Sequence, residues 1–209
     1  MADGRSRDRG QAFPIYVVVV TGLLFAALAF FVVGQASVTR SDAQGAADAS
    51  ALAAAREVRD EAFTGLDLGA LKPEDWEKLL KGDLLTGRGG CAAAGDFAAR
   101  NDNAVAECDS ALPRITVKVR TDRTVGSSVV PGTESMHGTA SATALIEPRC
   151  VLGSSGAGAT PGPAPTGVPE PLPTPVDVRC KGEPLQIDPL KPGSLRALSR
   201  SLFSVRLVD

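Results

Sequence analysis

The sequence has few of the residues on which catalysis and metal binding depend. It contains one histidine, His137, and four cysteines among 209 residues. The HExxH, GxSxG and Walker phosphate-loop motifs do not occur, and no two cysteines have the CxxC spacing of zinc or thioredoxin-like redox sites. His137 stands among Gly, Ser and Thr, a setting that favours an exposed loop. The sequence therefore predicts a non-enzymatic protein with no cofactor, no metal site and no small-molecule substrate. A secreted enzyme that uses His137 is an alternative hypothesis.

Charge is absent over a long stretch near the N-terminus. No Asp, Glu, Lys or Arg occurs between Arg9 and Arg40, whereas roughly 20 apolar residues suffice to span the hydrocarbon core of a bilayer. Residues 13–38 read FPIYVVVVTGLLFAALAFFVVGQASV. Backbone polar groups in lipid are satisfied only within a helix, and Pro14 falls in the first helical turn, where proline is tolerated. We therefore predict a transmembrane helix over residues 11–38.

Basic residues around this run predict its orientation. Lys and Arg collect on the cytoplasmic side of a membrane, and the residues before the run include Arg5, Arg7 and Arg9. This pattern predicts a single-pass protein of the cell membrane, with residues 1–10 in the cytoplasm and everything after Arg40 outside the cell.

A cleaved secretory signal is the main alternative to a retained anchor. Gly34 and Ala36 resemble a small-residue cleavage site, and Ser37 follows them. A signal sequence, however, has an apolar core of about 7–15 residues, and this run is considerably longer. We favour the retained anchor; under both hypotheses the rest of the chain is exported.

Aromatic residues are scarce, and the net charge of −2 shows no basic excess that would favour nucleic acid as a partner. Aromatics make up 4% of the chain, so the exported part has few bulky side chains with which to fill a core. Disulfides would compensate for a thin core, and they form in exported proteins. The candidates are Cys91, Cys108, Cys150 and Cys180, which allow three pairings.

Alanine-rich sequence continues the helix beyond the predicted membrane span, over residues 39–63. Its small residues recur at helical spacing and form a shallow apolar stripe. Small residues allow close helix packing, both here and within the span, although chance also explains the pair in the span. The helix-packing candidates are Gly22, Ala26, Ala47, Ala51 and Ala55. On another face, Arg56 and Asp60 stand one turn apart and predict a weak ion pair.

Residues 64–152 predict an α+β domain. A helix is expected in LKPEDWEKLLKGD, with Pro73 in its first turn, Gly82 as its C-terminal cap and a packing face of Trp76, Leu79 and Leu80. A second short helix is expected around residues 94–98, followed by an Asn-Asp-Asn turn at residues 101–103. Apolar and polar residues alternate over residues 115–120, which indicates a strand buried on one face. Residues 138–146 predict a further antiparallel strand, and residues 125–130 a weaker one.

Proline and glycine dominate residues 153–175, which predicts an exposed, disordered loop without helix or central strand. Residues 176–209 then complete the domain, with a strand at 176–180, a helix within 192–203 and a strand at 204–208. A bridge between Cys91 and Cys108 would join the short helix to the strand at 115–120. A bridge between Cys150 and Cys180 would close the loop.

Two short motifs give this chain a family resemblance. Arg9-Gly10 precedes the apolar run, and the more specific stretch Gln44-Gly45-Ala46-Ala47-Asp48-Ala49-Ser50-Ala51-Leu52-Ala53 follows it. Residues 9–62 resemble the N-terminus of TadE/TadG-like proteins of the tight-adherence (Flp) pilus system. Residues 91–147 resemble the outer part of TadE-like proteins more moderately, with an alanine-rich helix, an Asn turn and a Cys-bearing strand.

The resemblance implies a minor pseudopilin-like or scaffolding component of pilus assembly or secretion, whose partners are the lipid bilayer and other pilus or secretion-machine subunits. One departure from the family concerns processing. Prepilins carry Glu at the fifth position after the processed Gly, and here Ile15 occupies that place after Gly10. This favours a retained, TadG-like protein over a polymerising pilin. The alternative function is a membrane-anchored extracellular binding module that contacts cell-wall polymer or another protein.

Overall fold

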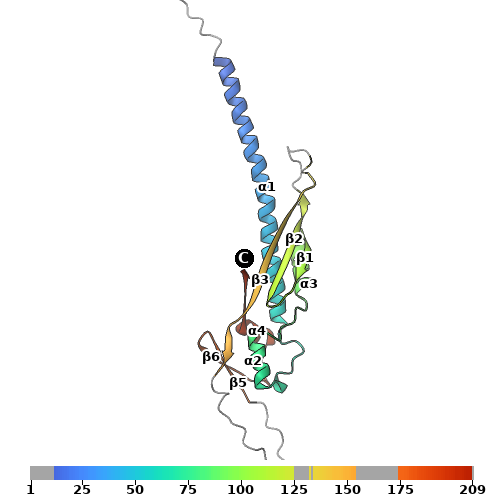
Figure 1. Ribbon diagram of the computed structural model, residues 1–209, viewed down its shortest axis with the longest axis vertical. Helices are drawn as coiled ribbons and strands as arrows, with labels where there is room; N and C mark the ends of the chain where they lie inside the picture. The colour runs from blue at the N-terminus through green and yellow to red at the C-terminus, as the bar shows by residue number, and fades with distance from the viewer. Residues whose placement is uncertain (1–11, 125–131, 133, 154–173, 209) are drawn as a thin grey trace, which may run out of the picture.

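A computed structural model of the protein describes residues 12–124, 132, 134–153 and 174–208. One helix, α1 (Ala12–Asp60), runs through most of it (Figure 1). Its 49 residues span about 74 Å at 1.5 Å per residue. Residues 12–38, the apolar half of α1, project beyond the other elements. Residues 39–60, the packed half, lie against a sheet and, with the rest of the described chain, form what we call the head.

The main sheet of the head has four antiparallel strands in the order β1-β2-β3-β7. The strands are β1 (Asn103–Asp109), β2 (Arg114–Thr124), β3 (His137–Pro148) and β7 (Phe203–Val208). The alternation seen in the sequence becomes a buried face of β2, made by Ile115, Val117 and Val119. The α+β fold class and the strands predicted within β2, β3 and β7 are confirmed.

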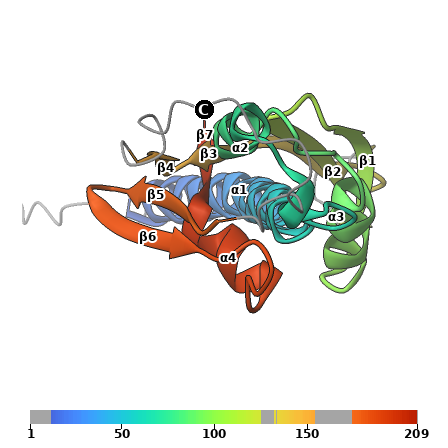
Figure 2. The ribbon, with the colours of Figure 1, turned by 90° about the horizontal axis from the view of Figure 1, so that it is seen from below.

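The packed half of α1 covers this buried face. Seen along the helix (Figure 2), β1, β2 and β3 curve around one side of α1, while β5, β6 and α4 lie on the other. The stripe of small residues on α1 is fully buried, with Ala47, Ala51 and Ala55 each 0% exposed. Small side chains let the helix axis approach the strands closely, and larger side chains such as Phe63 and Phe203 fill the far end of the core.

Three short α-helices and a 3₁₀ turn flank α1. They are η1 (Leu68–Ala70), α2 (Pro73–Lys81), α3 (Gly90–Ala99) and α4 (Leu195–Leu202). Helix α2 begins with Pro73, ends at Gly82 in the left-handed conformation and buries Trp76, Leu79 and Leu80, as predicted. The N-terminus of α3 lies so close to α1 that a Cβ on Gly90 would stand 2.9 Å from Val58 Cγ2, so only glycine fits there.

A second, smaller sheet closes the end of the head opposite the apolar half of α1. It has the order β4-β5-β6 and consists of β4 (Cys150–Leu152), β5 (Val176–Cys180) and β6 (Glu183–Ile187). The strand β5 was predicted, whereas β4 and β6 were not. Lys181 and Gly182 join β5 to β6 with φ angles of 50° and 93°, which is the geometry of a tight hairpin turn.

The predicted surroundings of His137 and of Asp60 were wrong. His137 is not on an exposed loop: it is the first residue of β3, is half-buried, and its Nδ1 lies 2.6 Å from the carbonyl oxygen of Thr121. Asp60 does not pair with Arg56; its carboxylate binds Arg59 and two arginines of α4 instead. The weak strand predicted at residues 125–130 and all but the ends of the proline-rich segment 153–175 lie outside the described residues.

Candidate functional site

The apolar half of α1 leaves residues Phe13–Phe31 outside the protein core. Residues Phe13–Phe31 have a mean hydropathy of 2.4, and none of them is buried. At 1.5 Å per residue they cover about 28 Å, against about 30 Å for the hydrocarbon core of a bilayer. Gly22 and Ala26 lie on this half and are exposed. By length and composition, the helix can cross a membrane, and its large exposed side chains have no cover within the described chain.

The other helix-packing candidates have a different environment. Ala47, Ala51 and Ala55 face the protein's own sheet and α3, where they are 0% exposed. They allow close packing inside the head, which leaves them no surface for a second molecule. A contact between helices of two molecules through Gly22 and Ala26 stays a prediction.

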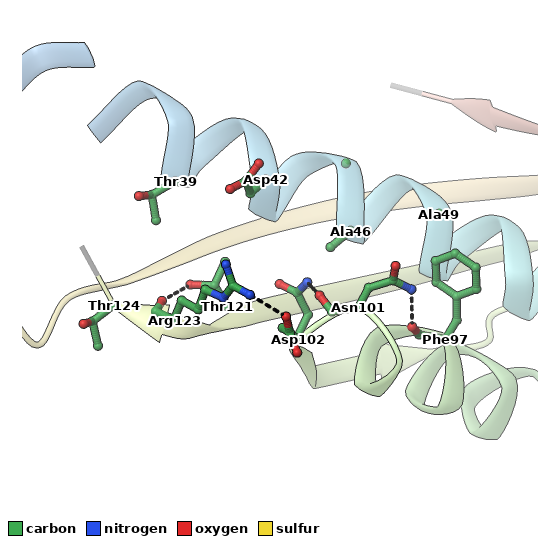
Figure 3. A pocket seen from close by; sticks show the side chains of 12 residues that line it. Thr39, Asp42, Ala46, Ala49, Phe97, Asn101, Asp102, Thr121, Arg123 and Thr124 are labelled. Atoms are coloured by element: carbon green, nitrogen blue, oxygen red, sulfur yellow. Dashed lines mark hydrogen bonds and ion pairs between the residues drawn. The ribbon is translucent and has the colours of Figure 1, made fainter. Parts of the chain in front are cut away.

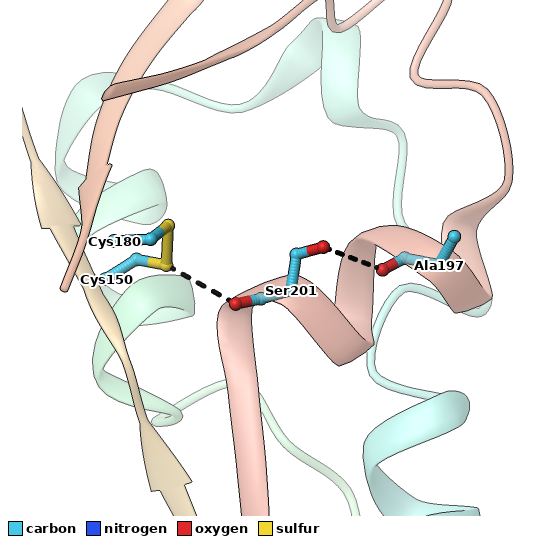
Figure 4. Close-up of a disulfide and its surroundings, with 4 residues drawn as sticks. All are labelled: Cys150, Cys180, Ala197 and Ser201. Atoms are coloured by element: carbon cyan, nitrogen blue, oxygen red, sulfur yellow. Dashed lines mark hydrogen bonds between the residues drawn. A yellow bond between two sulfur atoms is a disulfide. The ribbon is translucent and has the colours of Figure 1, made fainter. Parts of the chain in front are cut away.

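Two disulfides join elements of the head. Cys91 of α3 is bonded to Cys108 of β1, with a Cα–Cα distance of 5.8 Å, so the bridge reaches the edge strand β1 and not the neighbouring strand β2. Cys150 and Cys180 are bonded across β4 and β5, where they are register partners (Figure 4). The bridges enclose chain segments with sequence separations of 17 and 30, for which the chain-entropy estimate gives roughly 3–4 kcal/mol each.

A cluster of three arginines surrounds Asp60, the last residue of α1. The Asp60 side chain is 9% exposed, and its oxygens lie 2.8 Å from Arg59 Nη2, 2.7 Å from Arg200 Nη2 and 3.6 Å from Arg196 Nε. Burial alone would raise the pKa of Asp60, but hydrogen bonds from Arg200 and Arg59 outweigh it and hold the pKa below its usual value. The cluster ties the end of α1 to α4.

A groove of about 460 Å³ opens between the packed half of α1 and the edge of the sheet (Figure 3). Asp42, Gly45 and Ala46 of α1 line one wall. The opposite wall comes from α3, from the turn that leads into β1 and from the end of β2, and includes Asp102 and Arg123. The volume is within the range of ligand sites, about 300–1,000 Å³.

The groove carries one negative charge in excess. Arg123 Nη2 lies 2.9 Å from Asp102 Oδ2, so these two charges compensate each other. Asp42 has no ion pair among the described residues and leaves its charge uncompensated. Asn103 also lines the groove and is 8% exposed; its Nδ2 donates to the carbonyl oxygen of Asn101, while its Oδ1 accepts no hydrogen bond within the described chain.

Sequence reasoning did not find this groove. The sequence predicts only a turn at Asp102 and Asn103, and no motif marks Asp42. About 60 residues separate Asp42 from the turn, and no local pattern indicates that the fold brings them together. Within the described ranges, no group of three or more His, Cys, Asp or Glu side chains could hold a metal ion.

These features define a class of protein: a disulfide-bridged α+β head built on a helix that continues into an exposed apolar span long enough for a membrane. Residues 10–57 match the family model for TadE/G-like proteins of Flp pilus assembly. The match covers the apolar half of α1 and most of its packed half, and it confirms the resemblance seen in the sequence over this segment. No curated protein and no solved structure matches the chain.

Proposed function

We propose that this protein is a single-pass membrane component of Flp-type pilus assembly or of a related secretion machine, with a minor pseudopilin-like or scaffolding role. The observation that carries the proposal is the match of residues 10–57 to the TadE/G-like family. The exposed apolar half of α1 supports it, because such a surface needs lipid or the apolar helices of other subunits around it.

The charges flanking the apolar half support a cytoplasmic N-terminus. Three arginines precede the span within residues 1–10, and basic residues are retained on the cytoplasmic side. The head then lies outside the cell. Its four cysteines all form disulfides, as expected in an oxidising compartment.

In this function, α1 acts as a rigid connection between membrane and head. The helix is continuous from Ala12 to Asp60, and its packed half is buried in the sheet. The alanine stripe packs the middle of this half into the head, and the Asp60 cluster ties its C-terminal end to α4. The head is thereby held at a set height and rotation relative to the span, where it can contact neighbouring subunits without any catalytic step.

Exchange of the span tests the proposal. In a strain that lacks the gene, the native protein should restore piliation, adhesion and secretion. A variant in which an unrelated transmembrane helix replaces residues 11–38 should be inserted in the membrane but fail to restore them, because lateral packing requires the native helix.

Two results would contradict the proposal. Loss of the gene with no change in pili, adhesion or secretion would remove the assembly role. Full function of the head on the foreign span would instead support the alternative hypothesis, an anchored module that binds cell-wall polymer or another protein through its head. Immunoblots of membrane fractions serve as the control for insertion and amount.

A further inference from the structure

We propose that the groove beside α1 is a self-association site, in which Arg40 of a second copy of this chain enters the groove and pairs with Asp42. The inference rests on the proposed membrane anchoring, because anchoring holds two copies at one level. It assigns one contact surface on the head and one partner, a second copy of the chain, both of which the proposed function leaves open.

Charge favours a basic side chain as the occupant. Arg123 is already paired with Asp102 across 2.9 Å, so the uncompensated charge of the groove is that of the exposed Asp42 carboxylate. A guanidinium matches a carboxylate with two parallel hydrogen bonds, and it is desolvated more readily than an ammonium group. An arginine therefore meets the charge and the shape of this site.

The position of Arg40 on α1 makes it the fitting arginine. Arg40 is exposed and has no ion pair among the described residues. It precedes Asp42 by two residues, which places it about 3 Å away along the helix axis and about 160° around it. The groove and Arg40 thus lie at the same height but on nearly opposite sides of one helix.

Anchoring in a membrane turns this arrangement into a contact. Two parallel copies inserted to the same depth hold Arg40 of one copy level with Asp42 of its neighbour, and confinement to a plane raises their effective concentration. Arg56, the next exposed arginine of α1, lies about 24 Å further along the helix, out of reach of the groove. Because Arg40 and the groove are different surfaces, the contact is heterologous and can repeat from copy to copy.

Filling the groove is the first test. Gly45 lines the groove, and a Cβ placed on it has no atom within 4 Å, so Gly45→Gln introduces a side chain into the cavity without a clash in the head. Gly95→Gln is the matched control: Gly95 is also helical and equally open, but it does not line the groove. Both changes replace glycine by a better helix former.

The measurement uses the full-length chain in phosphatidylcholine vesicles, with energy transfer between donor- and acceptor-labelled copies as the readout. Energy transfer should rise with the protein-to-lipid ratio for the native chain and for Gly95→Gln. At a given protein-to-lipid ratio, energy transfer should be lower for Gly45→Gln than for the native chain, because its association constant should be lower by roughly tenfold or more. Equal association of all three proteins overturns the proposal.

Exchange of charges is the second test. Arg40→Glu places two acids opposite each other, and Asp42→Arg places two arginines opposite each other; each should lower the association constant by roughly tenfold. The double variant Arg40→Glu/Asp42→Arg keeps the net charge, restores an attractive pair and should recover most of the native association. A double variant that associates as weakly as the single variants overturns the proposal. That result is expected if the groove binds a polysaccharide or a different protein instead of Arg40.

Vesicle flotation separates this inference from the proposed function. A chain that floats with the vesicles but shows no energy transfer contradicts the self-association site alone. A chain that does not float contradicts the membrane anchor, and with it the proposed function.

Discussion

The carboxylate of Asp60, at the end of α1, lies 2.7 Å from the guanidinium of Arg200 on α4, although 140 residues separate them. The contact fastens the C-terminal helix to the helix that enters the head from the apolar half. Arg59 and Arg196 share the same carboxylate, so one acid organises three basic side chains.

Replacement of Asp60 by Asn should destabilise the head. The substitution keeps the volume but leaves three arginines facing each other around a largely buried position, and we expect a loss of about 1–2 kcal/mol in the free energy of unfolding. The matched control is Glu77→Gln, which removes the fully exposed pair with Lys81 and should leave stability unchanged. Urea unfolding in detergent, followed by the fluorescence of Trp76, measures both.

The contribution of Asp60 should also depend on pH. Its pKa in the folded protein is below the unfolded value of about 3.9, because hydrogen bonds from Arg200 and Arg59 outweigh the opposing effect of burial. The stabilisation is therefore complete above pH 3.9 and is lost as the pH falls through the folded pKa. The difference in unfolding free energy between the native protein and Asp60→Asn should stay constant from pH 7 to pH 5 and shrink below pH 4. A difference that grows on acidification would contradict this assignment.

Replacing single alanines of α1 by leucine should show which half of the helix packs against its own chain. Ala51 is 0% exposed against the sheet, so Ala51→Leu should overpack the core and cost about 1–3 kcal/mol. Ala26 is exposed on the apolar half, and Ala26→Leu should leave the stability of the head unchanged. Thermal unfolding of the two variants in the same detergent provides the comparison. An equal loss from both would mean that the two halves of the helix unfold together.

Removal of the bridge between α3 and β1 should free an edge of the main sheet. The double variant Cys91→Ser/Cys108→Ser should lower the unfolding free energy by about 2–4 kcal/mol, since it opens a loop with a sequence separation of 17. Hydrogen exchange should then accelerate in β1 before it does in β2 or β3. Intact mass before and after reduction and alkylation verifies that the remaining bridge, between Cys150 and Cys180, is still formed.

Local sequence patterns predicted the elements in which burial follows the spacing of the apolar residues along the chain. The alternation of Ile115, Val117 and Val119 gave one buried face of β2, and proline and glycine set the ends of α2. The alanine stripe on α1 was recognised as apolar, but its partner was not, because small residues suit a sheet of the same chain as well as a helix of another.

What the sequence did not reveal depends on contacts between distant segments. The strand β6 follows a Lys181-Gly182 turn, which is a weaker hairpin signal than Asn-Gly or Asp-Gly. The sequence predicts a pair between Asp60 and Arg56, one turn away, whereas folding brings Arg196 and Arg200 of α4 to Asp60. The groove is formed in the same way, since its two walls are far apart in the chain and neither has a binding motif of its own.

The register pair Cys150–Cys180 also has a practical meaning for the segment it encloses. Beyond the bridge, Leu152 still pairs with Val178, and Gly153 donates a backbone hydrogen bond to Asp177, so the two exits from the small sheet emerge next to each other. Loop-closure entropy changes only slowly with length once the ends are fixed. An insertion between Gly153 and Thr174 therefore has both ends fixed by the small sheet, which favours this segment for grafting an epitope or a fluorescent reporter onto the head.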